Sequence, residues 1–370
     1  MRYPLSTLLV LLGFLTAAHG QPTLKEAFKG QLLVGAALNG SHISGTNADN
    51  CEIALVESQF NSISPENILK WEPVHPSADT YNFGPADRYV EFGVKSHMFI
   101  VGHTLVWHSQ TPRWVFEDAE KNPVGRDTLL KRMHDHIASV VGRYKGRING
   151  WDVVNEALNE DGTLRKSRWL QIIGEDYILK AYQFAHEADP GAELYYNEFS
   201  LENPIKRQGA IELIRNLQSH GIPIKAVGLQ GHYKMNWPSP ALLDETIQAF
   251  GALGVKVSVT EFDMDVLPPA TASRSADVGM RLNYQAKANP YTNGLPDSVQ
   301  QELASRYAAL FRVFLKNAKV MERVTFWGVT DRNSWLNDWP VRGRTSHPLL
   351  FDRNCKPKPA FDAVIATAAR

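Results

Sequence analysis

Two glutamate residues stand at the ends of apolar, β-branched runs of the kind that form buried strands. Glu156 ends the run that begins at Ile148, and Glu261 follows the run that begins at Val255. Carboxylates at strand ends are available for chemistry, and a pair of them is the minimum equipment for cleaving a glycosidic bond. A lone strand-end glutamate is more often a salt-bridge or helix-cap residue, so the pair must be judged together with its neighbours.

The ends of the other predicted strands carry an unusually polar and aromatic set of residues. Sugars explain this mixture well, because their ring faces stack on tryptophan and their hydroxyls need amide, lysine or carboxylate partners. Each residue alone has a structural explanation, but so many polar groups together are costly if nothing binds there. The set comprises Glu66, Asn67, Lys70, Trp71, His103, Trp107, His108, Asn155, Tyr196, Asn197, Glu198, Gln230, His232, Asp263, Trp327, Asp331, Arg332 and Trp335.

The elements that must position these residues alternate between strand and helix eight times. Short apolar runs predict the strands, and apolar residues at three- and four-residue spacing predict amphipathic helices. Eight βα units predict an α/β fold, a single-domain (β/α)8 TIM barrel. A doubly wound open sheet would also alternate, but the glycine-rich stretch near 35–45 lacks the G-x-G-x-x-G spacing. The predicted strands are Leu32–Asn39, Phe60–Ser64, Met98–Trp107, Ile148–Glu156, Glu193–Phe199, Ala226–Tyr233, Val255–Asp263 and Arg323–Thr330; the predicted helices include Asp127–Tyr144, Asp176–Ala188, Ile205–His220, Ser239–Leu253 and Asp297–Ala318.

Residues 264–296 form one long irregular stretch directly after the strand that carries Glu261. Its prolines and the Asn293-Gly294 pair predict an ordered or semi-ordered loop on the face where barrel enzymes build their active sites. A mobile surface insertion explains the same stretch equally well. No linker, charge run or internal repeat calls for a second domain, so residues 21–370 are expected to form one catalytic domain.

Charge and the N-terminal segment bear on partners and location. Lys plus Arg and Asp plus Glu both number 39, which gives no reason to expect a nucleic acid or an anionic surface as partner. Residues 1–20 combine Arg2, an apolar core and a small-residue site at 18–20, which is typical of a cleavable export signal. We therefore expect a secreted or periplasmic protein without a membrane span, and nothing demands more than a monomer.

Cys51 and Cys355 are the two cysteines of the chain, too few for a disulfide-built scaffold. In an oxidising compartment they could form one bridge that ties the first helix region to the last. Two buried free thiols are the alternative.

The histidines do not have the spacing of a common metal site. His103 and His108 lie on or just beyond one predicted strand, while His134 and His136 fit helix-surface or packing positions. A phosphate loop, a G-x-S-x-G motif and a placed Cys-His pair are all missing from the sequence. We therefore expect no catalytic metal and no cofactor.

Six sets of motifs, in order along the chain, resemble glycoside hydrolase family 10, the (β/α)8 endo-β-1,4-xylanases. The resemblance extends from about Lys25 to Ala363, and a chance match of this set in order is not credible. The motifs are Ser64–Asn67 with Lys70–Pro73, Gly102–His108, Trp151–Leu158, Gly228–His232, Thr260–Asp263 and Phe326–Asp331.

The resemblance implies a role for each catalytic group. Glu156 would be the general acid/base and Glu261 the nucleophile of a retaining mechanism, which needs carboxyl groups about 5 to 5.5 Å apart. His232 and Asp263 would keep Glu261 ionised and aimed, and that charge would raise the pKa of Glu156. Asn155 would support catalysis by bonding the sugar 2-hydroxyl near the cleavage point.

The implied substrate is xylan, together with xylo-oligosaccharides. A β-1,4-glucanase or dual-specificity glycanase is the alternative among enzymes, and a non-catalytic carbohydrate-binding barrel is the alternative outside them. The fifth strand ends in Tyr196–Ser200 where many family members have Tyr-Asn-Asp-Tyr-Asn, which leaves the sugar contacts on the leaving side open. The implied substrate-binding residues are Glu66, Asn67, Lys70, His103, Trp107, Tyr196, Asn197, Gln230, Trp327 and Trp335.

Overall fold

The computed structural model describes residues 21–44, 51–268 and 276–368. The expected export signal over residues 1–20 therefore lies outside the described residues, as does part of the long loop. Within the described ranges the apolar runs form strands close to the predicted bounds. The strands are β1 Leu33–Leu38, β2 Ser62–Pro65, β3 Phe99–Trp107, β4 Gly150–Asn155, β5 Glu193–Glu198, β6 Ile224–Leu229, β7 His232–Lys234, β8 Lys256–Asp265 and β9 Met321–Phe326.

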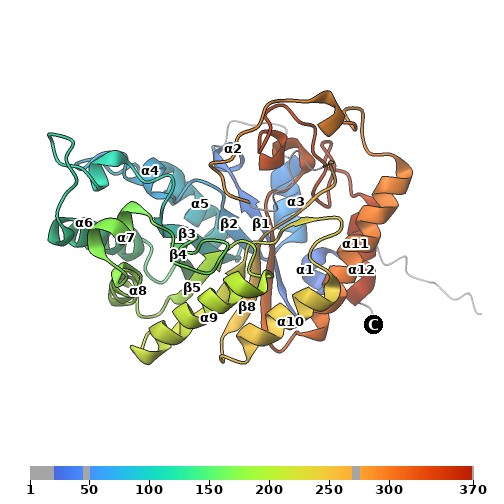
Figure 1. Ribbon diagram of the computed structural model, residues 1–370. Helices are drawn as coiled ribbons and strands as arrows, with labels where there is room; N and C mark the ends of the chain where they lie inside the picture. Colours follow the sequence, from blue (N-terminus) through green and yellow to red (C-terminus); the bar gives the residue numbers. More distant parts are fainter. Residues whose placement is uncertain (1–20, 45–50, 269–275, 369–370) are drawn as a thin grey trace, which may run out of the picture.

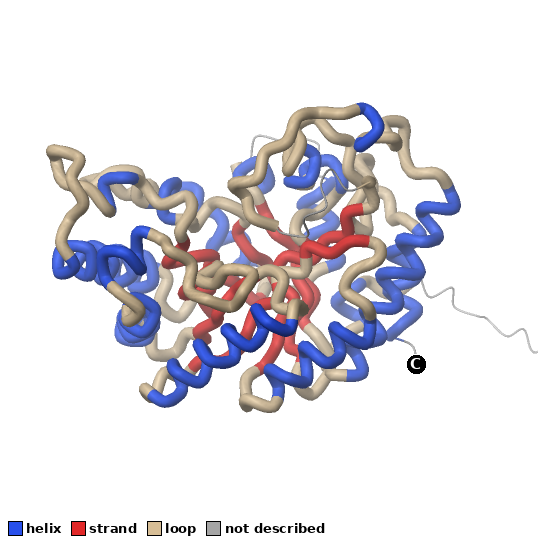
Figure 2. The backbone as a smooth tube through the Cα atoms, viewed as in Figure 1, coloured by secondary structure: helices blue, strands red, loops and turns tan. Residues whose placement is uncertain are grey.

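The strands are parallel and close into a barrel. Neighbours follow the chain from β1 to β6, and β6 then pairs with β8, β8 with β9 and β9 with β1. The closing register places Gly35 beside Thr325. The predicted single-domain (β/α)8 barrel is confirmed, because eight strands complete the circle and helices surround it (Figure 2).

The sixth predicted strand differs from the prediction because it is broken in two. Gln230 and Gly231 separate β6 from β7, and β7 pairs only with the far end of β8. Gly231 has φ +83°, and a Cβ atom there would lie 2.5 Å from Val259 Cγ1. The break is thus compatible only with glycine, and it changes the path of the chain beside the barrel mouth.

Amphipathic helices pack around the strands (Figure 1). In α6 the buried residues Leu129, Met133 and Ile137 recur at four-residue spacing, so one face of the helix covers the barrel. His136 also lies on that helix and is fully buried with its ring stacked 3.7 Å from Trp71, which confirms packing rather than a surface position. The α-helices are α1 Leu24–Ala27, α2 Gly40–Ile43, α3 Cys51–Gln59, α4 Trp71–Val74, α5 Gly84–Lys95, α6 Arg126–Arg143, α7 Arg168–Ile173, α8 Tyr177–Ala188, α9 Pro204–Ser219, α10 Pro240–Gly251, α11 Asp297–Lys316 and α12 Pro359–Ala368, and the 3₁₀ helices are η1 Arg113–Val115, η2 Ala286–Ala288, η3 Asp331–Asn333 and η4 Trp335–Asn337.

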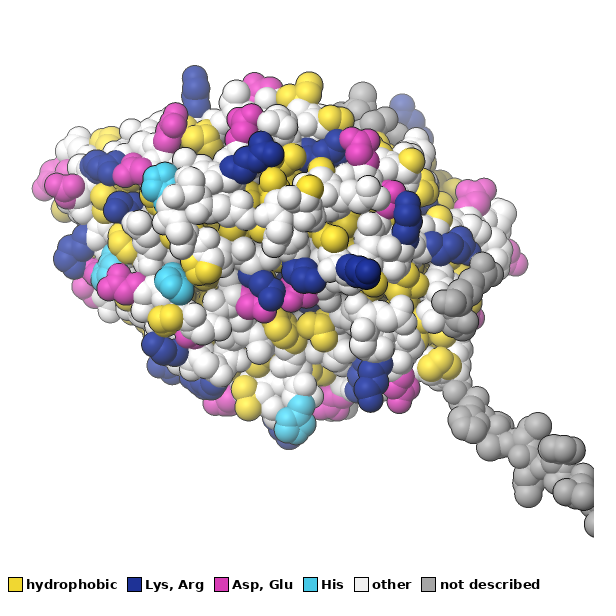
Figure 3. Space-filling model, turned by 90° about the horizontal axis from the view of Figure 1, so that it is seen from below, with side chains coloured by type: hydrophobic (Ala, Val, Ile, Leu, Met, Phe, Trp, Pro, Cys, Tyr) yellow, Lys and Arg dark blue, Asp and Glu magenta, His cyan; other side chains and the backbone are white. Residues whose placement is uncertain are grey.

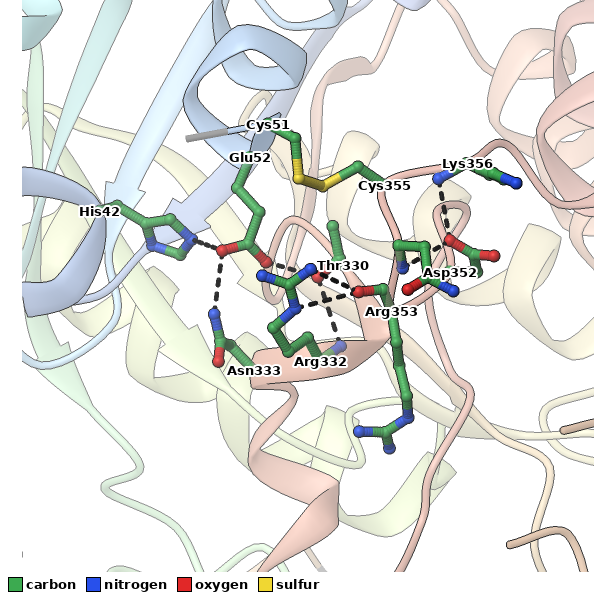
Figure 4. The surroundings of a disulfide bond; sticks show 11 residues. His42, Cys51, Glu52, Thr330, Arg332, Asn333, Asp352, Arg353, Cys355 and Lys356 are labelled. Carbon is green, nitrogen blue, oxygen red and sulfur yellow. Dashed lines mark hydrogen bonds and ion pairs between the residues drawn. A yellow bond between two sulfur atoms is a disulfide. The ribbon is translucent and has the colours of Figure 1, made fainter. Parts of the chain in front are cut away.

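A disulfide joins Cys51 at the start of α3 to Cys355 in the loop before α12 (Figure 4). Of the two alternatives for these cysteines, the bridge is therefore the one found. The half-cystines are 304 residues apart, and closing so long a loop stabilises the fold by up to about 5 kcal/mol in the chain-entropy account. Beside the bridge, buried Glu52 lies 3.2 Å from His42 Nε2 and accepts hydrogen bonds from Thr330 and Asn333.

The outer surface mixes charges of both signs. On the face shown in Figure 3, Lys and Arg side chains are interspersed with Asp and Glu side chains rather than gathered by sign. Among the helices of the described residues, none is long and apolar enough to cross a membrane.

Candidate active site

A groove of about 450 Å³ lies at the carboxyl ends of the barrel strands. Its lining comes from β3, β4, β7 and β8, from the break after β6, and from the residues that follow β2, β3, β4, β8 and β9. The lining residues are Glu66, Asn67, Lys70, His103, Trp107, Ser109, Gln110, Asn155, Glu156, Gln230, His232, Glu261, Ala276, Val278, Arg281, Trp327, Trp335, Asp338 and Trp339. All of the site residues predicted from the sequence are in this lining except Asp263, Tyr196 and Asn197.

Glu156 follows β4 and is held by two neutral hydrogen-bond donors. Trp107 Nε1 donates to its Oε2 at 2.8 Å, and Gln230 Nε2 donates to its Oε1 at 2.9 Å. Burial raises the pKa of Glu156, although both donors act against burial, and the charge of Glu261 adds to the rise. The sequence predicted the contribution of Glu261 to this pKa, but burial is the larger cause.

Glu261 lies within β8 and faces a positively charged donor. His232 Nε2 is 3.2 Å from its Oε2, and Asn197 Nδ2 donates to its Oε1 at 2.7 Å. Burial alone would raise the pKa of Glu261. The hydrogen bond from His232 and the charges of His103, His232 and Lys70 outweigh burial and hold this pKa below its usual value. This carboxylate therefore stays ionised, as a nucleophile requires.

Asp263 keeps His232 protonated and oriented. Its Oδ2 lies 3.1 Å from His232 Nδ1 and also accepts a hydrogen bond of 2.6 Å from Trp335 Nε1. Burial acts to lower the pKa of His232, but Asp263 and Glu261 together raise it to about 10. The imidazolium thus lies between the two carboxylates, and it is one source of positive charge beside Glu261.

Two predicted sugar contacts need correction. Tyr196 is completely buried and its hydroxyl donates to Glu198 Oε2 at 2.8 Å, so this ring does not line the groove. Asn197 is also completely buried. Its amide nitrogen donates to Glu261 Oε1, and its amide oxygen accepts a hydrogen bond from Thr260. Glu198, one of the departures from the family pattern, is completely buried with Lys206 Nζ 3.0 Å away, so it pairs with Lys206 instead of lining the groove.

The remaining predicted residues form a polar and aromatic wall. Lys70 Nζ lies 4.7 Å from the centre of the Trp107 ring and donates to Asn67 Oδ1 at 3.0 Å. His103 Nδ1 lies 2.9 Å from Asp152 Oδ2, and its ring meets Trp327 edge to face at 5.5 Å. Such rings and fixed polar groups suit a pyranose, which has flat apolar faces and equatorial hydroxyls.

The structure adds groove residues that sequence reasoning missed. Trp339 stacks on Trp335 with ring centroids 4.5 Å apart, and the four-residue spacing of these tryptophans was a usable signal. Ala276, Val278 and Arg281 belong to the long loop, which thus contributes an ordered wall where the structure describes it. In the described part of the chain, no group of three or more His, Cys, Asp or Glu side chains is placed to hold a metal ion.

The chain is similar in sequence to known proteins over almost all of its length. The family model of glycosyl hydrolase family 10 matches residues 23–367. Endo-1,4-beta-xylanase A of Xylanibacter ruminicola is 43% identical over 357 residues, which cover 96% of each chain. Beta-1,4-xylanase of Dictyoglomus thermophilum is 42% identical over 359 residues, covering 96% of this chain and 94% of that protein.

Solved structures of xylanases are also similar to the fold of this chain. A GH10 endoxylanase retrieved from a sugarcane soil metagenome superposes with a TM-score of 0.89 at 42% identity, covering 94% of this chain and 99% of the other. Xylanase B from Clostridium stercorarium F9 superposes with a TM-score of 0.83 at 36% identity, covering 93% and 99%.

Proposed function

The chain belongs to glycosyl hydrolase family 10 and is an endo-1,4-β-xylanase that hydrolyses xylan, and we propose that it does so by a retaining double displacement. The observation that carries this mechanism is a pair of buried carboxyl groups in one groove with opposite pKa shifts. The pKa of Glu156 is raised, which favours its protonated form, while the pKa of Glu261 is lowered, which favours its charged form.

In the first step, Glu261 attacks the anomeric carbon while Glu156 protonates the leaving oxygen, which forms a glycosyl-enzyme and releases one half of the chain. Glu261 loses its charge in this ester, so the pKa of Glu156 falls and its carboxylate can accept a proton. In the second step, Glu156 takes a proton from water, and the hydroxide oxygen displaces Glu261 from the same carbon. Two inversions give net retention.

The groove residues have separate tasks in this proposal. Asn155 and Gln230 line the groove together with the two carboxyl groups, and a bond from them to the sugar 2-hydroxyl would strengthen as positive charge develops on the ring. Trp107, Trp327 and Trp335 would stack on sugar rings. Glu66, Asn67, Lys70 and His103 would bind hydroxyls on the non-reducing side.

The stereochemical outcome tests the mechanism. Proton NMR of xylohexaose hydrolysis should show the β-anomer forming first, with the α-anomer appearing later by mutarotation. A 2-deoxy-2-fluoro xylobioside with a dinitrophenyl leaving group should add one glycosyl mass to wild type and none to Glu261→Ala. Initial formation of the α-anomer would overturn the mechanism, and sugar release from soluble cellulose but not from xylan would contradict the assigned substrate.

We also propose that the protein is exported and acts as a monomer. The apolar leader over residues 1–20 supports export, and so does the Cys51–Cys355 disulfide, because such bonds persist in oxidising compartments. N-terminal sequencing of the protein recovered outside the cytoplasm should begin near Gln21, and retention of residues 1–20 would contradict the proposal.

A further inference from the structure

Arg165 contacts the backbone of the acid/base from the loop after β4. Its Nε donates to the carbonyl oxygen of Glu156 at 3.2 Å, and its own N–H donates to the carbonyl of Ala157 at 2.7 Å. Glu156 has φ +56°, a left-handed conformation that side-chain-bearing residues rarely adopt. The peptide of Glu156 therefore needs support from its surroundings, and Arg165 provides a charged donor at that point.

Asp277 holds Arg165 from a distant part of the chain. Its Oδ2 lies 3.1 Å from Arg165 Nη1. Asp277 belongs to residues 276–282, here called the bridging segment, which is fixed at its other side by two contacts with the loop after β9. Trp339 Nε1 donates to the carbonyl of Asp277 at 3.2 Å, and the N–H of Leu282 donates to the carbonyl of Pro340 at 2.8 Å.

The bridging segment connects opposite sides of the barrel mouth. In the circular order of the eight barrel strands, β4 and β9 lie across from each other. The segment touches the loops that follow both strands, and Ala276 and Val278 within it line the groove. Its position is thus linked to the backbone of Glu156 through Arg165.

We propose that Arg165 and Asp277 are positioning residues for the acid/base: Arg165 fixes the peptide of Glu156, and Asp277 fixes Arg165. This inference rests on the proposed role of Glu156 in protonating the leaving oxygen. Proton transfer depends on the carboxyl group being within hydrogen-bond reach of that oxygen, so a small displacement of its backbone lowers the rate.

The charge of Arg165 gives a second effect that can be measured. It acts to lower the pKa of Glu156, against the dominant effect of burial. The other charged groups that face Glu156 are Glu261 on β8, Glu198 on β5 and Lys70 before α4. His108 Nε2 lies 3.9 Å from Glu156 Oε2, but burial and the charge of Arg165 lower its pKa to about 4, so it is neutral above that pH.

The test compares two substrates that differ in their need for acid catalysis. Xylohexaose has a sugar leaving group that needs protonation, whereas the dinitrophenolate of a dinitrophenyl xylobioside departs without it. In Arg165→Met, we expect kcat/KM for xylohexaose to fall about 10- to 100-fold and kcat/KM for the aryl substrate to change less than about 3-fold. Asp277→Asn should lower kcat/KM for xylohexaose about 3- to 10-fold and again have less effect on the aryl substrate.

The pH profile separates positioning from a general structural role. Loss of the Arg165 charge should move the basic limb of kcat/KM for xylohexaose to higher pH in Arg165→Met. Arg165→Lys keeps the charge and should leave that limb in place while losing part of the rate. If Arg165→Met does not fold, Arg165→Lys and Asp277→Asn still give the substrate split.

Arg168→Met is the matched control, because Arg168 pairs with Glu117 at 2.8 Å in the same region without contacting Glu156. It should leave both substrates and the pH profile unchanged. Equal losses on both substrates in Arg165→Met and Asp277→Asn, with an unmoved basic limb, overturn the inference. If Glu156→Ala itself loses both substrates equally, the role of Glu156 is wrong, and that failure is seen without any change at Arg165.

Discussion

Glu156 and Glu261 lie in the same groove and are nearly equally buried, with exposures of 4% and 6%, yet their pKa values move in opposite directions. Each carboxylate accepts two side-chain hydrogen bonds, so the number of donors does not explain the difference. The donors to Glu156 are the neutral groups of Trp107 and Gln230, whereas one donor to Glu261 is the protonated His232. The comparison indicates that the charge of the donors, not their number, moves the two pKa values in opposite directions, and the proposed roles of acid and nucleophile follow this difference.

Removing Glu261 tests the comparison most severely. Glu261→Ala should lower kcat on xylan by about 10⁴-fold or more, because no other group can form the covalent intermediate. Reducing-sugar release measures the loss. Glu91→Ala, at an exposed position on α5, should keep the wild-type rate. Turnover by Glu261→Ala within a few-fold of wild type would contradict the nucleophile assignment.

Removing Glu156 should have a smaller effect that depends on the leaving group. Glu156→Ala should lose about 10²- to 10⁴-fold in kcat/KM on xylan, the usual contribution of general acid catalysis. With a dinitrophenyl xylobioside, kcat/KM should stay near the wild-type value and the basic limb of its pH profile should vanish. A basic limb that persists in this variant would mean that another group supplies the proton.

Replacing His232 should bring the pKa values of Glu156 and Glu261 closer together. His232→Asn removes the positive donor, so the pKa of Glu261 should rise toward that of Glu156 and the acid limb of kcat/KM should move to higher pH. At pH 5 the rate should fall about 10-fold. His134→Asn, at a half-exposed position on α6, is the control and should not move the limb. An unmoved acid limb in His232→Asn would show that Glu261 is held ionised by other groups.

The smallest expected effect is on stability, and its sign differs for the two residues. The lowered pKa of Glu261 gives stability that is present above pH 4.5 and is lost as the pH falls through the folded-state value. The raised pKa of Glu156 costs stability as the pH rises above 4.5.

Urea unfolding between pH 4 and pH 7 should reveal this contrast. Relative to wild type, the gain in unfolding free energy over this range should be about 1 kcal/mol smaller in Glu261→Gln and about 1 kcal/mol larger in Glu156→Gln. Changes of the same sign in both variants would show that burial, not the charge of the donors, dominates both sites.

Sequence reasoning predicted the barrel and placed Glu156 and Glu261 at strand ends, where the structure brings both into one groove, because apolar strands and strand-end carboxylates are local signals. It did not predict the break between β6 and β7, since the need for glycine at 231 arises from Val259 on a neighbouring strand. Tyr196 was misplaced although the strand itself was predicted. Side chains alternate along a strand, so Tyr196 and Asn197 point to opposite sides, and only Asn197 can reach Glu261.

The position of the bridging segment could not be predicted from local sequence signals, for a similar reason. Whether residues 276–282 wall the groove depends on Arg165 and Trp339, which are distant in sequence and become partners only after the barrel closes. Likewise, the hydrogen bond from Trp107 to Glu156 joins two adjacent strands whose register the sequence does not specify.

The disulfide has a consequence for covalent integrity. Because Cys51 and Cys355 enclose most of the polypeptide, a protease that cuts once in any loop between them leaves both fragments joined in one molecule. Singly nicked enzyme should therefore migrate as one molecule in a denaturing gel until a reducing agent is added. If the protein is exported as proposed, a first cut by a secreted protease would thus leave Glu156 and Glu261 in one covalent molecule.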